Sequence, residues 1–206
     1  MAPSFAEWLI THPAYHFMIK ISSEFLNDSF NFYGLKKDVE NYQAALSIIK
    51  KTSFHEDVYN PVDIVSAIHL YGLAHQRFIC TYEGCEKIVA KWRAKTYPMC
   101  PRYLCKGCIC LPYGLSEIPN ELHVKLFCPN CQDVYDVTNP AIANIDGAYF
   151  GPTYVHLLKQ KFRTVTPRGL PVAFVPCVFG FKMDRKKDRK SKKNTKTSSD
   201  DQPLRV

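Results

Sequence analysis

The sequence contains no run of eighteen or more apolar residues, so no segment is predicted to span a membrane. Its first residues, MAPSFAEWLITHP, lack the basic region and the long apolar region of a secretory signal peptide. It also lacks a glycine-rich phosphate loop, the HRD and DFG motifs, the nucleophile elbow and the HExxH motif. These absences predict an intracellular protein without a catalytic centre of a familiar type.

What the sequence does contain is the composition of a globular protein, with 46% apolar, 13% aromatic and 22% charged residues. A chain of 206 residues can bury roughly 70% of the surface that it exposes when unfolded. Its core therefore does not depend on disulfides. In an intracellular protein, the nine cysteines are predicted to be metal ligands or buried thiols.

Positive charge is concentrated at the C-terminal end. The net charge is +8, but residues 184–206 hold nine Lys or Arg against four Asp, which leaves 18 basic and 15 acidic residues in the body. This segment has one leucine, one valine and no aromatic residue, so it is predicted to be a disordered basic tail. Such a tail serves as a nuclear address, as a contact for polyanions, or only to keep the protein soluble.

Residues 4 to about 94 show the apolar spacing of amphipathic helices, which predicts a mainly α-helical domain over residues 1–95. Asn60 followed by Pro61 is a helix N-terminal signal. His69 and His75 fall on or beside the apolar stripe that follows, so they are interpreted as packed or surface histidines rather than ligands. The apolar stripes are Val39, Tyr42, Leu46 and Ile49; Ile64, Ile68, Tyr71 and His75; and Ile88, Val89 and Trp92, the last within a helix expected over residues 85–95.

From Thr96 onward, proline, glycine and cysteine separate short runs that are typical of strands, at residues 123–127 and 133–137. A further β-rich run, VAFVPCVFGFKM, covers residues 172–183. The predicted fold class is therefore α+β. Its predicted parts are the helical domain 1–95, a small β domain over 96–145, a C-terminal segment over 146–183 and the basic tail 184–206.

Six cysteines lie in two clusters, CPRYLCKGCIC and CPNC. Two Cys pairs about twenty residues apart are typical of a structural zinc site, in which tetrahedral Zn²⁺ takes thiolates from two short turns. Cys128 and Cys131 form one pair. The other pair is ambiguous: by spacing alone Cys105 with Cys108, which fits C-x₂-C, is the natural choice, but Cys100 with Cys105, which fits C-x₄-C, also falls within the usual range.

A site with four thiolates leaves no position for water, so its metal would stabilise the fold rather than catalyse a reaction. The apolar residues of this small β domain alternate imperfectly, which places apolar side chains on both faces. One face can cover the rest of the chain, and the other is expected to need a partner, most simply a second copy in a C₂ dimer. The imperfectly alternating apolar residues of the small β domain are Val124, Leu126, Phe127, Val134 and Tyr135.

Two other functions could use the same cysteines. A zinc ribbon that binds nucleic acid needs clustered Lys or Arg, whereas the charges of residues 96–140 nearly cancel, so nucleic-acid binding is disfavoured. CPNC could be a redox pair, but no βαβ unit surrounds it. The remaining cysteines, Cys80, Cys85 and Cys177, are predicted to be buried thiols.

Six stretches occur in a fixed order along the chain: FNFYGL, YGLAHQRFI, CPRYLC, LPYGLSEIPNELHVKLFCPNCQDVYDV, DGAYFG and FVPCVFGFK. Together they resemble the regulatory (beta) subunit of the protein kinase casein kinase II, over residues 5 to about 183. The resemblance implies a non-catalytic protein that carries structural Zn²⁺ and forms a homodimer through the zinc ribbon. The ligands that it implies are Cys100, Cys105, Cys128 and Cys131, and the dimer contacts that it implies are Pro101, Tyr103 and Val134.

The resemblance further implies that each copy binds a catalytic (alpha) subunit in an α₂β₂ holoenzyme and modulates which protein substrates it phosphorylates, in the cytoplasm and nucleus. The implied docking residues are Leu157, Phe179 and Phe181. The two phenylalanines are expected to point the same way on one strand. Here the first of them replaces the family's tyrosine, Asp184 stands where an uncharged or basic residue is usual, and the basic tail replaces a C-terminal helix.

Two regulatory features of the family are reduced in this sequence. The acidic stretch that follows the helix ending near Lys51 is replaced by KKTSFHEDVYN, so a response to polyamines is expected to be lost. At the N-terminus, Ser4 with Glu7 three residues later is a minimal acid-directed phosphorylation site.

Overall fold

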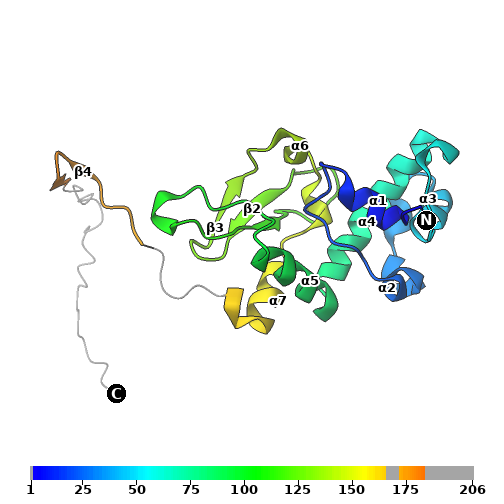
Figure 1. Ribbon diagram of the computed structural model, residues 1–206, viewed down its shortest axis with the longest axis horizontal. Coiled ribbons are helices and arrows are strands. Elements are labelled where there is room, and N and C mark those ends of the chain that lie inside the picture. The colour runs from blue at the N-terminus through cyan, green and yellow to red at the C-terminus, as the bar shows by residue number, and fades with distance from the viewer. Residues whose placement is uncertain (1, 166–171, 184–206) are drawn as a thin grey trace, which may run out of the picture. The chain divides into compact units, whose positions relative to one another are not determined.

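The computed structural model describes residues 2–165 and 172–183 (Figure 1). Of the described residues, those up to 165 together with Val172 form one compact unit, and residues 173–183 belong to a second. The fold is mixed α and β, as predicted, and no helix in the described ranges is both long and apolar enough to cross a membrane. The elements are α1 (Phe5–Thr11), α2 (Ser23–Asn27), α3 (Tyr42–Ile49), α4 (Pro61–Ile79), α5 (Tyr82–Arg93), β1 (Leu111–Tyr113), β2 (Lys125–Cys128), β3 (Asp133–Asp136), α6 (Pro140–Ala143), α7 (Tyr154–Lys161), β4 (Cys177–Val178) and β5 (Phe181–Lys182).

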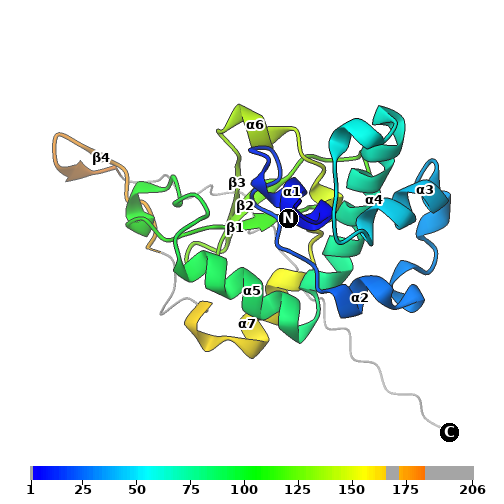
Figure 2. The ribbon, with the colours of Figure 1, turned by 45° about the vertical axis from the view of Figure 1, so that its right-hand side comes forward.

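Helix α4, the 19-residue helix at the centre of the first unit, begins where the sequence predicts. The Asn60 side chain accepts a hydrogen bond from the Val62 backbone N–H at 2.9 Å, and Pro61 occupies the first turn. It packs against α3 and α5 (Figure 2). Of its apolar stripe, Ile64, Tyr71 and His75 are buried and Ile68 is half-buried. The helices predicted around residues 39–49 and 85–95 are thus confirmed as α3 and α5.

The helical region is interrupted more often than the apolar spacing indicates. Between α1 and α3, the described chain contains only the short helix α2 and two 3₁₀ turns. Val39 is buried but precedes α3, because the intervening Asn41 has a φ of 47°, a left-handed conformation that cannot continue a right-handed helix. Spacing alone could not reveal this break.

Two buried polar side chains of α4 tie it to the rest of the unit. The Tyr71 hydroxyl accepts from the Ile21 N–H at 2.9 Å and donates to the Ile19 carbonyl at 3.2 Å. His75 Nε2 accepts from the Ile19 N–H at 3.1 Å, and its Nδ1 donates to the Tyr149 carbonyl at 2.8 Å. His75 is fully buried, which confirms that it is a packed histidine.

The small β domain holds a three-stranded antiparallel sheet in the order β1–β2–β3. Leu111 pairs with Phe127, and Phe127 pairs with Val134. The predicted runs at residues 123–127 and 133–137 correspond to β2 and β3, whereas β1 was not predicted because it is three residues long and contains a proline. The buried residues of the helices and the sheet belong to one hydrophobic cluster. The proposed boundaries near residues 95 and 145 stay predictions, and the predicted tail lies outside the described residues.

The β-rich run 172–183 folds as a minimal hairpin, which we call the C-terminal hairpin, of two strands with two residues each. Cys177 pairs with Lys182 and Val178 pairs with Phe181. Phe179 and Gly180 form the turn, with φ values of 50° and 82°, as the tight turn of a two-residue hairpin requires. The prediction that Phe179 and Phe181 lie on one strand is therefore wrong.

Candidate metal centre

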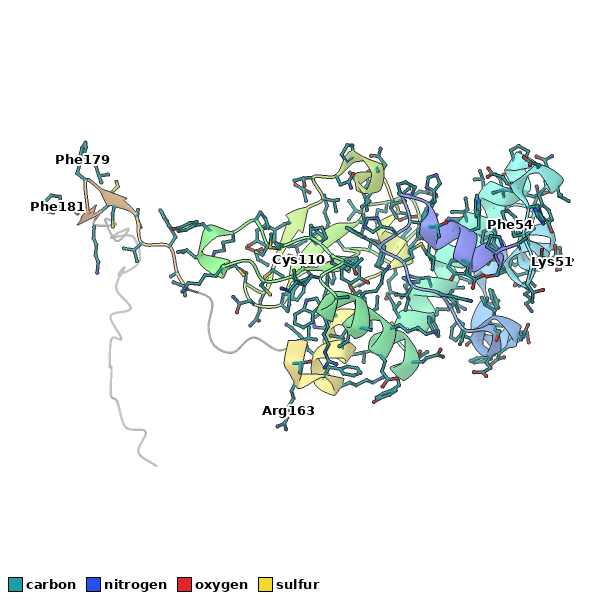
Figure 3. The ribbon with its side chains drawn as sticks, viewed as in Figure 1. Lys51, Phe54, Cys110, Arg163, Phe179 and Phe181 are labelled. Atoms are coloured by element: carbon teal, nitrogen blue, oxygen red, sulfur yellow. The ribbon has the colours of Figure 1, made fainter. Side chains whose placement is uncertain are left out.

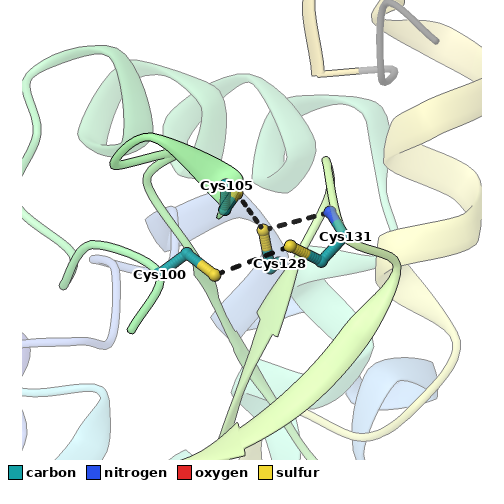
Figure 4. Close-up of side chains that lie close together, drawn as sticks. All are labelled: Cys100, Cys105, Cys128 and Cys131. Atoms are coloured by element: carbon teal, nitrogen blue, oxygen red, sulfur yellow. Dashed lines mark hydrogen bonds between the residues drawn. The ribbon is translucent and has the colours of Figure 1, made fainter. Parts of the chain in front are cut away.

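Four cysteines from two segments of the chain meet in the small β domain (Figure 4). We call Cys100, Cys105, Cys128 and Cys131 the cysteine cluster. All four are buried, and their sulfur atoms lie within 4.8 Å of one another. Such a group can hold a metal ion.

The first half of the cluster is built by a tight loop. Cys105 ends the 3₁₀ helix Tyr103–Cys105, and the next residue, Lys106, reverses the chain with a φ of 56°. The Cys100 N–H donates to the Cys108 carbonyl at 2.7 Å, which closes the loop at its base. The two sulfurs are therefore presented by one rigid turn.

The second half follows β2, whose last residue is Cys128. The Cys131 N–H donates to the Cys128 sulfur at 3.3 Å, and the Gln132 N–H donates to the Cys128 carbonyl at 2.8 Å. Across the cluster, the Asn130 side-chain amide donates to the Cys105 sulfur at 3.3 Å. N–H groups that point at sulfur stabilise thiolates, which are the forms that bind metals.

The spacing of the sulfurs fits a tetrahedral metal site. Four thiolates at 2.3 Å from a zinc ion would lie about 3.8 Å from one another. The Cys100 and Cys131 sulfurs are 3.8 Å apart, and the Cys105 and Cys128 sulfurs are 3.4 Å apart. An all-sulfur tetrahedral set suits zinc or iron rather than calcium or magnesium.

Tyr135 is a neighbour of the cluster that sequence reasoning treated only as an apolar ribbon residue. Its hydroxyl is buried and makes no aligned hydrogen bond within the described residues. The pKa of this hydroxyl is raised, first by burial and then by the adjacent sulfurs of Cys131 and Cys100. A buried hydroxyl beside two sulfurs is suited to donate a hydrogen bond to a thiolate ligand.

The two further cysteines of the first motif lie beside the cluster without belonging to it. Cys110 is fully buried, and the half-buried Cys108 thiol donates to the Ile109 carbonyl at 3.5 Å. The nearby thiol of Cys108, and then that of Cys110, lowers the pKa of Cys128. The cysteine cluster thus contains Cys100 rather than Cys108, although Cys108 is nearer to Cys105 in the sequence.

The residues expected at the dimer contact surround this centre. Pro101 and Tyr103 come from the first loop, where Pro101 is exposed and Tyr103 is 93% exposed. Val134 lies on β3 and is half-buried. The structure thus leaves the Tyr103 ring available for a contact.

The expected kinase contacts fall on two separate units. Leu157 is half-buried on α7. Phe179 and Phe181 belong to the C-terminal hairpin, where they are 96% and 79% exposed (Figure 3). Phe181 faces the same side as Val178, its cross-strand partner, while Phe179 stands at the turn.

The remaining cysteines differ in environment. Cys85 is buried, and its thiol donates to the Ile79 carbonyl at 3.3 Å, while Cys80 is half-buried. Cys177 is exposed on β4, so the prediction that it is a buried thiol is wrong. A two-residue strand has no layer of side chains above it in which a thiol could be buried.

Comparison with known proteins identifies the family. A sequence profile of the casein kinase II regulatory subunit matches residues 4–182. The chain belongs to the casein kinase II regulatory subunit family. Proteins of this family are regulatory rather than catalytic, which agrees with the absence of enzyme motifs in the sequence and implies a catalytic kinase subunit as partner.

Individual members resemble the chain over most of its length. Casein kinase II subunit beta of Schizosaccharomyces pombe is 37% identical over 180 residues, which cover 86% of this chain and 78% of the yeast protein. Casein kinase II subunit beta' of Drosophila melanogaster is 35% identical over 183 residues, or 87% of this chain and 84% of the fly protein. Casein kinase II subunit beta-2 of Neurospora crassa is 34% identical over 180 residues, which are 86% of this chain but 63% of the fungal protein.

Proposed function

We propose that this member of the casein kinase II regulatory subunit family is a zinc-stabilised homodimer that binds and stabilises catalytic subunits. The assembly is an α₂β₂ holoenzyme, in which the regulatory dimer modulates the selection of protein substrates. It acts in the cytoplasm and nucleus. The cysteine cluster, the exposed ribbon residues and the C-terminal hairpin each support one part of this proposal.

Zinc is the metal that suits the cysteine cluster best. The site offers four buried sulfurs at tetrahedral spacing, and Asn130 and Tyr135 supply donors beside them. When bound, Zn²⁺ would join the two loops and would leave no coordination position for water. The metal would therefore stabilise the ribbon and would take no part in phosphoryl transfer.

Dimerisation is supported by apolar side chains on the first loop of the ribbon. Tyr103 is 93% exposed and Met99 is 66% exposed. Val134 is only half-buried on the edge strand β3. Large exposed apolar side chains next to a sheet edge are typical of an interface.

The C-terminal hairpin is the observation that carries the kinase-docking role. A two-stranded hairpin is marginally stable on its own. This one nevertheless exposes Phe174, Phe179 and Phe181, by 68%, 96% and 79%. Aromatic side chains presented at the tip of a short hairpin are the kind of anchor that dominates protein interfaces once a partner buries them.

The proposal is tested by mixing the zinc-loaded full chain with the catalytic subunit of casein kinase II and measuring the mass of the complex by light scattering. We expect a complex with two copies of each chain, which melts at a higher temperature than the isolated catalytic subunit. Chelation of the metal should split the regulatory dimer. Separate elution of the two chains, at concentrations of about 10 μM that detect weak complexes, would contradict the proposal.

A further inference from the structure

Two serines in the described ranges stand three residues before a glutamate: Ser4 before Glu7, and Ser53 before Glu56. A hydroxyl followed at this distance by a carboxylate is the pattern that an acid-directed serine kinase recognises, because its own basic side chains pair with the carboxylate. At Ser53 a second carboxylate, that of Asp57, follows directly. The sequence alone does not distinguish the two serines, but their surroundings in the structure differ.

Ser4 is the N-cap of α1, and both groups of its motif are already engaged. The Ser4 hydroxyl accepts from the Glu7 N–H at 3.3 Å and donates to the Glu7 carboxylate at 2.9 Å. That carboxylate also forms an ion pair with Lys20 at 2.7 Å. The hydrogen bond from Lys20, and then those from Ser4, lower the pKa of Glu7 to about 2. A kinase would have to open the first turn of α1 to reach this hydroxyl.

Ser53 lies in the opposite situation, on the loop of residues 50–58 between α3 and α4, which we call the Ser53 loop. Ser53 is exposed, and neither its hydroxyl nor its backbone makes a hydrogen bond within the described residues. Glu56 and Asp57 are exposed as well, and in the described structure neither forms an ion pair. The hydroxyl and both carboxylates are therefore available to a kinase.

One buried ring holds the Ser53 loop against the helical region (Figure 3). Phe54 is 2% exposed, and its N–H donates to the Pro3 carbonyl at 2.8 Å. Its ring stacks on Tyr59 with 5.4 Å between the ring centroids and meets Phe5 edge-on at 5.2 Å. The residues on either side of Phe54, 50–53 and 55–58, are all exposed. The loop thus presents Ser53 to a partner while Phe54 remains in the core.

We propose that Ser53 is a phosphorylation site of this protein, and that an acid-directed serine kinase modifies it in preference to Ser4. In the reaction, the Ser53 oxygen bonds to the γ-phosphorus of Mg-ATP held by the kinase. The bond from that phosphorus to the β,γ-bridging oxygen breaks, ADP leaves, and the hydroxyl proton passes to a base of the kinase. The product carries a charge of about −2 on a loop whose two lysines and two carboxylates otherwise cancel. That this kinase is the catalytic subunit of casein kinase II rests on the proposed function.

The test incubates the zinc-loaded full chain with the catalytic subunit of casein kinase II and Mg-ATP, and measures phosphate at each residue by mass spectrometry of proteolytic peptides. We expect Ser53 to be phosphorylated about tenfold faster than Ser4, because a helix cap must open before Ser4 can react. Site-resolved detection separates both from Thr197 and Ser198, which also precede aspartates by three residues but lie outside the described residues. Faster phosphorylation of Ser4, or none at Ser53, would overturn the proposal.

Variants decide whether the two carboxylates of the Ser53 loop direct the reaction. Glu56→Gln with Asp57→Asn should slow phosphorylation of Ser53 about tenfold, because the kinase loses two charged contacts. The matched control is Glu40→Gln with Asp38→Asn, which makes the same pair of changes at exposed positions outside the loop. The control should change the rate less than about twofold, since exposed charges outside the contact are screened. Equal slowing by the two double variants would overturn the proposal.

The same samples separate this inference from the proposed holoenzyme. Light scattering reports whether the regulatory and catalytic chains form a complex, independently of phosphate at Ser53. A stable complex in which Ser53 stays unmodified would overturn the phosphorylation site alone. Phosphorylation of Ser53 without a stable complex would support the site and would contradict the proposed function.

Discussion

Replacement of His75 by glutamine should remove most of the acid sensitivity of folding between pH 7 and pH 5. His75 is fully buried on α4 and bridges the Ile19 N–H and the Tyr149 carbonyl. The pKa of His75 is lowered from 6.5 to about 4, mainly by burial and also by the charge of Lys91, while the hydrogen bond to Tyr149 opposes the shift. The folded protein therefore keeps this ring neutral.

The direction of the effect follows from proton linkage. Between pH 6.5 and pH 4, the unfolded chain binds a proton at His75 that the folded chain does not bind, so the free energy of unfolding falls as the pH falls. The shift corresponds to a loss of about 2 kcal/mol between pH 7 and pH 5, and of about 3 kcal/mol once the pH is below both pKa values. Well above pH 6.5, His75 is neutral in both the folded and the unfolded chain, so this loss of stability is absent.

Urea unfolding at pH 7, 6 and 5, followed by circular dichroism, measures this loss in the wild-type chain and in His75→Gln. The variant should be less stable at pH 7 by about 1–3 kcal/mol, because a buried hydrogen bond is weakened. Its stability should then change by about 2 kcal/mol less than that of the wild type on acidification. Other titrating groups contribute equally to both chains, so parallel pH dependences would refute the assignment of the effect to His75.

Three further substitutions test the metal centre and the core. Cys100→Ser should release the bound zinc in a colorimetric chelator assay, whereas Cys108→Ser should keep it; the opposite pattern would exchange their roles. Tyr135→Phe should weaken metal affinity about 10–100-fold in a competition titration, and an unchanged affinity would exclude a hydrogen bond from its hydroxyl to a ligand thiolate. Gly72→Ala should destabilise the protein by about 1–3 kcal/mol, because the added Cβ would lie 2.4 Å from the Tyr149 ring. This loss should outweigh the better helix propensity of alanine. A higher melting temperature of the variant would contradict this packing.

The features that could be predicted from the sequence are those that local chemistry determines. Asn60 before Pro61 defines the start of α4, because a side-chain acceptor followed by proline satisfies the first helical turn. The two Cys pairs predict loops that bring sulfurs together. Spacing alone favoured Cys108 over Cys100, although both choices lie within the range that a tight turn allows, and the family resemblance pointed to Cys100, which the structure places in the cluster.

The features that could not be predicted depend on backbone conformation or tertiary packing. Phe179 has a positive φ, which is uncommon for an aromatic residue, so alternation along a strand was the natural but wrong expectation. The following Gly180 was the available signal for a turn. One cavity of the first unit is lined by Tyr15, Ser66 and Tyr149, which are far apart in the sequence, so only folding places them around it.

Docking through the C-terminal hairpin is tested most directly by calorimetric titration of the zinc-loaded chain with the catalytic subunit of casein kinase II. Phe179→Ala with Phe181→Ala should weaken binding by at least about 2 kcal/mol, or about thirtyfold, as expected for buried aromatic anchors. The matched control is Phe30→Ala with Tyr33→Ala, which removes two rings of 79% and 80% exposure from the helical region and should leave the affinity unchanged. Tight binding of the hairpin variant to the catalytic subunit would contradict docking through the hairpin, and so would a loss of binding in the control variant instead.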